Sequence, residues 1–274
     1  MLEADMTLSS RNTVFKTGIA FSLVILIVLL AASSTALPFY PELQQDAAFR
    51  PLEFFTPAPL VPYLTMIAAV LYALVTLAFI FYYFEKTQSP EILFVAFFAL
   101  SFAFEAARIM PPLRTALELP GVSLGLAQRF LLFGRYSGVF SIFAASICAA
   151  GLEMQSPRPT ILIITLSALV IAAGIPVDGF SWDSSFSMIV GYRSMFGLLE
   201  AALALATSVS FIVAAHTRGS REYIIIGAGA FLAFLGRSLF IRADAWITPL
   251  PGLALLALGT LFICGKLRQV YLWL

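Results

Sequence analysis

The sequence predicts an all-α integral membrane protein, a single bundle of eight transmembrane helices over residues 1–274. Hydrophobic residues make up 61% of the chain and charged residues 11%, whereas soluble domains have about half and about a quarter. The apolar runs are continuous and about 20 residues long, which is the length of a spanning helix. Strands of a membrane barrel would instead alternate in polarity over about ten residues. The composition and the run length together therefore indicate helices.

The eight predicted segments are separated by prolines and polar stretches, which stop helices. They cover residues 15–37, 60–84, 91–110, 129–151, 159–176, 192–215, 223–242 and 249–270. PELQQD and the prolines after it separate the first two segments, and PPLRTALELPG follows the third. Aromatic residues favour membrane interfaces, and five of them fall at segment ends: Tyr82, Tyr83, Trp182, Trp246 and Trp273.

The first segment has two interpretations. Ser34-Thr35-Ala36 follows an apolar core and resembles a signal-peptidase site, and cleavage there would leave seven helices. The region before that core is long and contains acidic residues, which favours an uncleaved first helix.

The orientation in the membrane is judged from the positive charges. Lysine and arginine are evenly divided between the two faces, but several arginines of one face fall inside helices and count less. We therefore expect a multi-pass protein of a bacterial inner membrane with both termini in the cytoplasm.

The two halves of the chain show weak internal similarity. A shift of 132 residues aligns Phe79-Ile80 with Phe211-Ile212 and places Glu105 opposite Arg237. One hypothesis is a parallel 4+4 repeat with halves 14–153 and 158–274. The alternative is chance similarity between two apolar sequences.

Charged residues inside the predicted spans are the main functional signal. At about 1.5 Å of rise per residue, four of them lie about 8 to 10 Å below the non-cytoplasmic ends of their helices. They are Glu105, Arg135, Glu200 and Arg237, and they define what we call the charged layer. Charges at membrane depth are costly, so they usually face the bundle interior and pair with one another. We predict that the two glutamates pair with the two arginines, and that Glu105 also pairs with Arg108 at i+3.

The charged layer has two interpretations. It is either an ion-pair network that fixes the register of the helices, or a polar pocket for a small anionic or zwitterionic ligand. Further arginines toward the surface favour the pocket, because a structural network needs only balanced pairs. The candidate ligand-binding residues are Glu105, Arg108, Arg135, Tyr136, Arg193, Glu200, Arg237 and Arg242.

Several small residues are expected to serve packing. Gly134 and Gly138 form a GxxxG pair, which permits close contact between helices. GAGAF at 227–231 is a second small-residue face. Cys148 and Cys264 lie in apolar runs and are expected to be buried as small side chains.

Catalytic and cofactor signatures are not found in the sequence. His216 is the only histidine, so neither a bis-histidine haem site nor a two-histidine zinc site can form within the chain. No Walker, HExxH or GxSxG motif occurs. We therefore predict no cofactor, no metal and no catalytic residues.

Three functions fit this pattern. The first is a receptor-like or sensor-like bundle that relies on a protein partner for an output domain. The second is a small secondary transporter for an anionic or zwitterionic solute, and the third is a structural or assembly subunit. An enzyme acting on lipid headgroups, with Glu105 or Glu200 as base, is the least expected. The net charge of +1 predicts no nucleic-acid partner, so the expected partners are membrane lipids, a small ligand and a protein.

Overall fold

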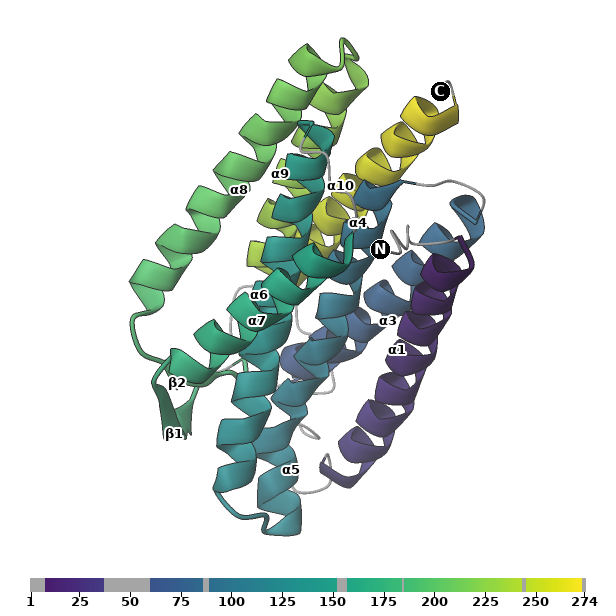
Figure 1. Cartoon of the computed structure of the whole chain (residues 1–274). Coiled ribbons are helices and arrows are strands. Elements are labelled where there is room, and N and C mark those ends of the chain that lie inside the picture. The colour runs from purple at the N-terminus through teal and green to yellow at the C-terminus, as the bar shows by residue number, and fades with distance from the viewer. Residues whose placement is uncertain are drawn as a thin grey trace.

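The computed structural model describes residues 8–36, 60–85, 89–151, 157–183, 185–242 and 245–272. Within these ranges it is a bundle of long helices with one small hairpin (Figure 1). Eight helical spans are long and apolar enough to cross a membrane, which suggests a membrane-embedded protein. They are α1 (Leu8–Ala36), α3 (Leu60–Tyr83), a composite third span (Pro90–Leu117), α6 (Val122–Ala149), α7 (Pro157–Gly174), α8 (Arg193–Thr217), α9 (Glu222–Ile241) and α10 (Pro249–Leu272). The predicted connection 38–58 and Trp273 lie outside the described residues.

The prediction that Pro111 ends the third span is wrong. The chain continues as α5 (Met110–Leu117), in which Pro111 and Pro112 occupy the first turn. Backbone N–H groups in a first turn have no helical partner, so proline is tolerated there. α6 also begins at Val122 rather than at residue 129. Glu105 therefore lies about three turns from the end of its span, farther than the prediction placed it.

The third span changes helix type where its charges lie. α4 (Pro90–Ser101) passes into an eight-residue 3-10 helix, η3 (Phe102–Ile109), which leads into α5. A 3-10 helix has three residues per turn, so side chains at i and i+3 eclipse each other. Glu105 and Arg108 consequently lie on one face of η3. Such runs rarely exceed four residues, so tertiary contacts must hold this stretch in its tighter form.

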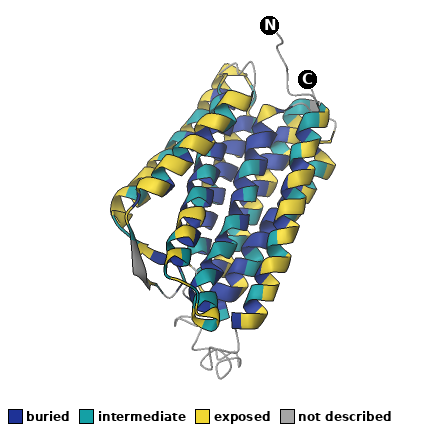
Figure 2. Cartoon of the chain, turned by 60° about the horizontal axis from the view of Figure 1, so that its bottom comes forward, coloured by how far each residue is buried: buried dark blue, intermediate teal, exposed yellow. Residues whose placement is uncertain are grey.

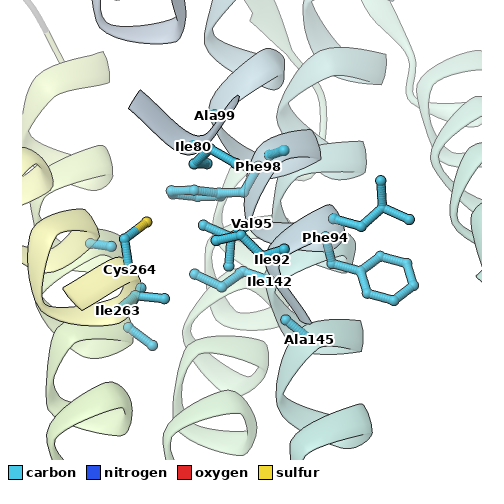
Figure 3. Close-up of a cluster of buried hydrophobic side chains, with 14 of the residues drawn as sticks. Ile80, Ile92, Phe94, Val95, Phe98, Ala99, Ile142, Ala145, Ile263 and Cys264 are labelled. Atoms are coloured by element: carbon cyan, nitrogen blue, oxygen red, sulfur yellow. The ribbon is translucent and has the colours of Figure 1, made fainter. Parts of the chain in front are cut away.

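The core lies between α3, α4, α6, α9 and α10. Figure 3 shows part of it, where side chains from four of these helices meet: Ile80 of α3, Phe98 of α4, Ile142 of α6 and Ile263 of α10. Buried residues fill the middle of the bundle, and exposed ones line its outside (Figure 2). α1, α7 and α8 bury the smallest part of their apolar surface, so they form the periphery. Exposed apolar side chains on these helices are suited to lipid.

Both predicted small-residue faces make close contacts. A side chain on Gly138 would overlap Ser101, and one on Gly134 would overlap Phe104, so α6 packs tightly on the third span. A Cβ on Gly229 would lie 2.9 Å from the carbonyl oxygen of Gly259, which brings the backbones of α9 and α10 together. The packing predictions are therefore confirmed. Both cysteines, Cys148 and Cys264, are buried, as expected.

A short antiparallel hairpin joins α7 to α8. Its strands are β1 (Val177–Trp182) and β2 (Met188–Val190), with Val177 opposite Val190. We call residues 177–190 the hairpin, and the end of the bundle where it lies the hairpin end (Figure 1). The opposite end, where α1 begins and α10 finishes, is the terminal end. Arg11 donates to the carbonyl of Phe84, directly after α3, and Arg268 lies over the ring of Tyr83 at the end of α3. The start of α1 and the end of α10 therefore lie at the same end of the bundle, as eight antiparallel spans require.

Candidate functional site

Glu105 is the centre of the charged layer. Its carboxylate accepts two hydrogen bonds from Arg135 of α6, from Nε to Oε1 at 2.7 Å and from Nη2 to Oε2 at 2.9 Å. Glu105 is only 2% exposed, so this pair is shielded from solvent. Two parallel bonds to one carboxylate are the strong, geometrically specific form of an arginine contact. The predicted pairing of Glu105 is confirmed.

Arg108 joins the same carboxylate to the hairpin. Its Nη1 lies 3.5 Å from Oε2 of Glu105, which confirms the predicted i, i+3 contact. Its Nε donates to the backbone carbonyl of Ser185 at 2.8 Å, and its Nη2 donates to the same oxygen. Arg108 is 2% exposed. A fully buried guanidinium thus uses a neutral peptide oxygen as its main partner.

Asp183 folds the hairpin turn that presents this carbonyl. One of its carboxylate oxygens, Oδ1, accepts from the backbone N–H of Ser185 at 3.0 Å and of Ser187 at 3.1 Å. The same oxygen accepts from the Ser185 hydroxyl at 2.6 Å. Aspartate commonly bonds the backbone two residues on, so the DSS sequence could have indicated the turn. Its docking onto Arg108 could not be foreseen, because it depends on how α7 and α8 are placed.

Two contacts from α6 fasten the hairpin further. Arg135 Nη2 donates to the hydroxyl of Ser187 at 3.4 Å. The side-chain oxygen of Gln128 accepts from the backbone N–H of Met188 at 3.3 Å, and Gln128 is itself buried. The hairpin therefore packs against the part of the charged layer around Arg108 and Arg135, and polar groups on two spans hold it there.

Arg237 and Glu200 form the second predicted pair. Nη1 of Arg237 in α9 donates to Oε2 of Glu200 in α8 at 3.0 Å. Its Nη2 donates to the backbone carbonyl of Arg135 at 3.1 Å, so one guanidinium connects α6, α8 and α9. The Arg237 side chain is 3% exposed and that of Glu200 is 32% exposed. The carboxylate of this pair is consequently the accessible member of the charged layer.

The remaining candidate residues lie apart from these ion pairs. Tyr136 is buried and packs its ring 5.8 Å from that of Phe196, between α6 and α8. Arg193 begins α8 and Arg242 follows α9, and both are exposed. Within the described ranges neither arginine forms an ion pair, because helix ends at the surface leave these long side chains in the open.

The balance of charge differs from the sequence-based expectation. Asp183 is close enough to interact electrostatically with Arg108 and Arg135. With it, three arginines (108, 135 and 237) face three carboxylates. The expected arginine surplus at this level is therefore smaller than predicted.

A second buried cluster, at the terminal end, escaped sequence analysis. Its centre is Glu91, in the first turn of α4 and 0% exposed. Oε2 of Glu91 accepts from the hydroxyls of Tyr271 at 2.6 Å and Ser89 at 2.8 Å, while Oε1 lies 3.6 Å from Arg218. Glu91 resembled the polar edge of a segment, so the sequence offered no sign that α10 would cover it.

Arg218 connects that cluster to two more helices. Its Nη1 donates to the hydroxyl of Tyr223 at 2.9 Å, and its Nη2 donates to the carbonyl of Cys148 at 2.9 Å. Burial disfavours the charged guanidinium, but nearby Tyr223 and Glu91 outweigh that effect and raise the pKa of Arg218. The terminal end is thus tied together around one carboxylate.

Comparisons with known proteins assign no family. No family model matches the chain, and no curated protein matches it. Among the described residues, no group of three or more His, Cys, Asp or Glu side chains is placed to hold a metal ion. The chemistry available at the charged layer is therefore that of guanidinium groups and carboxylates. Such groups recognise anions and zwitterions through charge-assisted hydrogen bonds.

Proposed function

We propose that this chain is a receptor-like or sensor-like membrane bundle whose hairpin covers a site for a small anionic or zwitterionic ligand. In this proposal the eight spans cross a bacterial inner membrane with both termini in the cytoplasm. The hairpin end then faces the non-cytoplasmic side, and the ligand reaches the charged layer from there. Binding displaces the hairpin, and the displacement is the signal.

The contact between Arg108 and the carbonyl of Ser185 carries this proposal. A buried guanidinium is costly to desolvate, and a neutral peptide oxygen compensates less than an anion does. The bonds from Arg108 to Ser185 already have a charged donor. A charged acceptor would add ion-pair attraction and a bidentate geometry that one carbonyl oxygen cannot offer. A ligand carboxylate or phosphate would thus replace Ser185 with a net gain at Arg108. The hairpin acts as an internal substitute for the ligand.

The charged groups around Arg108 indicate which charges the ligand should carry. Displacing the hairpin would take Asp183 away from Arg108 and Arg135 and leave them sharing Glu105 alone, so an added anion would replace the lost negative charge. Glu200 is partly exposed and engages one arginine, which leaves it suited to the ammonium group of a zwitterion. An amino acid, with one carboxylate and one ammonium group, has the charges that this pattern requires, and a small dicarboxylate would use the arginines alone.

Displacement of the hairpin could move the transmembrane helices in two ways. The hairpin is continuous with α8, whose Glu200 is held by Arg237 of α9. The second route is η3 itself. Residues advance about 120° each in a 3-10 helix but about 100° in an α-helix. If η3 relaxed to α-helix, Glu105 and Arg108 would turn about 60° apart, and the geometry of their contact would change.

The proposal includes a parallel 4+4 repeat and an output partner. The repeat hypothesis matches α1 with α7, α3 with α8, α4 with α9, and α6 with α10. α4 packs on α6 as α9 packs on α10, and α6 packs on α8 as α10 packs on α3. α1 packs on α3, but its counterpart α7 packs on α6 instead, so the peripheral helices depart from the symmetry. A protein that reads the movement of α8 would supply the output.

The ligand site is tested by thermal unfolding of the purified chain in detergent. Succinate, phosphate and glutamate are titrated as probes against wild type and Arg108→Gln. A ligand that binds the folded state raises the melting temperature in proportion to its occupancy. We expect at least one probe to stabilise wild type and to leave Arg108→Gln unchanged. Arg242→Gln is the matched control, because this arginine is exposed and outside the ion pairs, and it should respond like wild type.

A second variant separates ligand binding from a purely structural network. Asp183→Asn removes a charged acceptor from the turn, so the hairpin should compete less well with a ligand. We expect this variant to be less stable alone but to bind the active probe more tightly. If no probe shifts wild type or Asp183→Asn, the charged layer is structural, and the assembly-subunit alternative holds.

One observation favours a secondary transporter as the alternative. Transporter sites often lie where a membrane helix is interrupted, and the third span changes helix type at Glu105 and Arg108. A transporter predicts that radiolabelled succinate or glutamate accumulates in proteoliposomes containing the chain. Accumulation that Arg108→Gln abolishes would replace the sensor proposal.

A further inference from the structure

A long apolar groove lies between α3 and α10, away from the charged layer. Its volume is about 450 Å³. It is lined by six residues of α3 (Ala68, Leu71, Tyr72, Val75, Thr76 and Phe79) and four of α10 (Leu253, Ala257, Thr260 and Leu261). Exposed side chains at its mouth include Val75, 65% exposed, and Leu261, 52% exposed. The groove therefore opens on the outer surface of the bundle.

The polar atoms beneath the groove are already paired. The hydroxyls of Tyr72 and Thr260 lie 2.5 Å apart, and Thr260 donates to the carbonyl of Leu256 at 2.8 Å. These groups hold the floor of the groove together. Apolar cavities of this kind do not retain water, and an empty one forfeits van der Waals contacts along its walls. An apolar occupant is therefore expected.

The length and width of the groove fit a thin, extended molecule. Along α3 the lining runs from Ala68 to Phe79, about 16 Å of helix. All the space between the walls, about 940 Å³, gives a mean width of about 8 to 9 Å over this length. A helix with its side chains measures about 10–12 Å across, so a partner helix would not fit inside. A hydrocarbon chain would.

The guanidinium of Arg268 lies at one end of the groove. The guanidinium of Arg268 lies 4.7 Å from the ring centre of Tyr83, one turn beyond Phe79. Arg268 is exposed, and it has no carboxylate partner among the described residues. Its position bridges the ends of the same two helices that line the groove. An apolar channel that ends at an arginine matches an amphiphile with a negative head.

We infer that the groove between α3 and α10 binds a phospholipid, with an acyl chain along Thr76 and Ala257 and an anionic head at Arg268. The inference depends on membrane insertion of the bundle but not on the ligand proposed for the charged layer. The two sites use different residues, so one can fail without the other. An arginine near the membrane surface attracts the head of an anionic lipid. The apolar groove buries the acyl chain of that lipid.

Native mass spectrometry of the full chain in detergent tests this site. Phosphatidylglycerol and phosphatidylcholine with identical acyl chains are compared as probes. We expect one phosphatidylglycerol to be retained about fivefold more tightly than phosphatidylcholine, the preference that one arginine near the headgroup supplies. Arg268→Ala should abolish the preference, whereas Arg221→Ala, an exposed arginine at the same end, should preserve it.

Filling the groove should remove binding of both lipids. Val75→Trp places an indole at the mouth, and Ala257→Phe, a second variant, fills the interior. Leu258→Trp is the matched control, because Leu258 is 47% exposed on α10 but does not line the groove. Equal lipid retention by Val75→Trp and Leu258→Trp would overturn the inference. So would an unchanged preference in Arg268→Ala, or a dimer that Val75→Trp disrupts while lipid binding persists.

Discussion

Arg108 donates its Nε to the backbone carbonyl of Ser185 at 2.8 Å, across 77 residues of sequence. This contact joins the 3-10 helix of the third span to the hairpin between α7 and α8. The buried guanidinium of Arg108 is thus bonded to the hairpin, whose turn depends on one aspartate, Asp183. The stability of the hairpin and the accessibility of the charged layer should therefore be linked.

Loosening the hairpin turn should expose its inner face. Ser187 is 7% exposed, so a cysteine introduced by Ser187→Cys should react slowly with a water-soluble maleimide. Adding Asp183→Ala removes the acceptor for three hydrogen bonds, and we expect labelling to accelerate about tenfold, the effect of about 1.4 kcal/mol in the opening equilibrium. Ile189→Cys, at a position 51% exposed, should label fast in both backgrounds. Equal rates for Ser187→Cys with and without Asp183→Ala would show that the turn does not hold the hairpin.

Removing the charge of Glu105 should destabilise the bundle strongly. Glu105→Gln leaves Arg108 and Arg135 without their shared carboxylate, and breaking a buried pair in this way costs about 3 to 5 kcal/mol. Unfolding in mixed micelles measures the loss, with the exposed Glu85→Gln as a neutral control. The double variant Glu105→Gln/Arg135→Gln should lose less than the sum of the single changes. Additive losses would mean that the two residues are not energetically coupled.

The contact of α6 with the third span should be sensitive to a single methyl group. A Cβ on Gly138 would overlap Ser101, so Gly138→Ala should cost about 1 to 3 kcal/mol of unfolding free energy. Gly125 lies in the same helix, with no atom within 4 Å of the position its Cβ would take. Gly125→Ala should therefore be neutral or mildly stabilising. Similar melting temperatures for the two variants would contradict the close packing.

The terminal cluster should depend on the hydroxyl of Tyr271. Tyr271→Phe removes a 2.6 Å hydrogen bond to buried Glu91, which should cost about 1.5 to 3 kcal/mol because the acceptor is charged. Tyr82 is 80% exposed, and Tyr82→Phe serves as the matched control with no expected effect. Thermal unfolding of both variants at one detergent concentration checks this. A Tyr271→Phe chain as stable as wild type would place Glu91 in contact with another donor.

The predicted ion pairs of the charged layer did not require a tertiary structure. Glu105, Arg135, Glu200 and Arg237 all fall inside apolar spans, and unpaired charges at such positions are too costly to persist. The pairing of glutamates with arginines follows from that cost. Which glutamate meets which arginine does not follow, because it depends on the order of the helices around the bundle.

The hairpin, the 3-10 helix and the terminal cluster depended on the fold instead. Eight-residue 3-10 helices are disfavoured locally, so η3 exists through its contacts with α3 and α6. Ser185 contributes a backbone oxygen, which has no side-chain signature. Glu91 is buried because α10 returns to α4 from 180 residues away.

The sequence by itself determined that the chain is helical, how many apolar spans it has and which charged residues lie inside them. These properties are sums over local composition, and the free energy of burying each residue type decides them. Only the tertiary structure decided that the hairpin packs against Arg108 and Arg135, and that α3 and α10 leave a groove between them. Both depend on distances between segments far apart in the chain, which packing of the whole bundle sets.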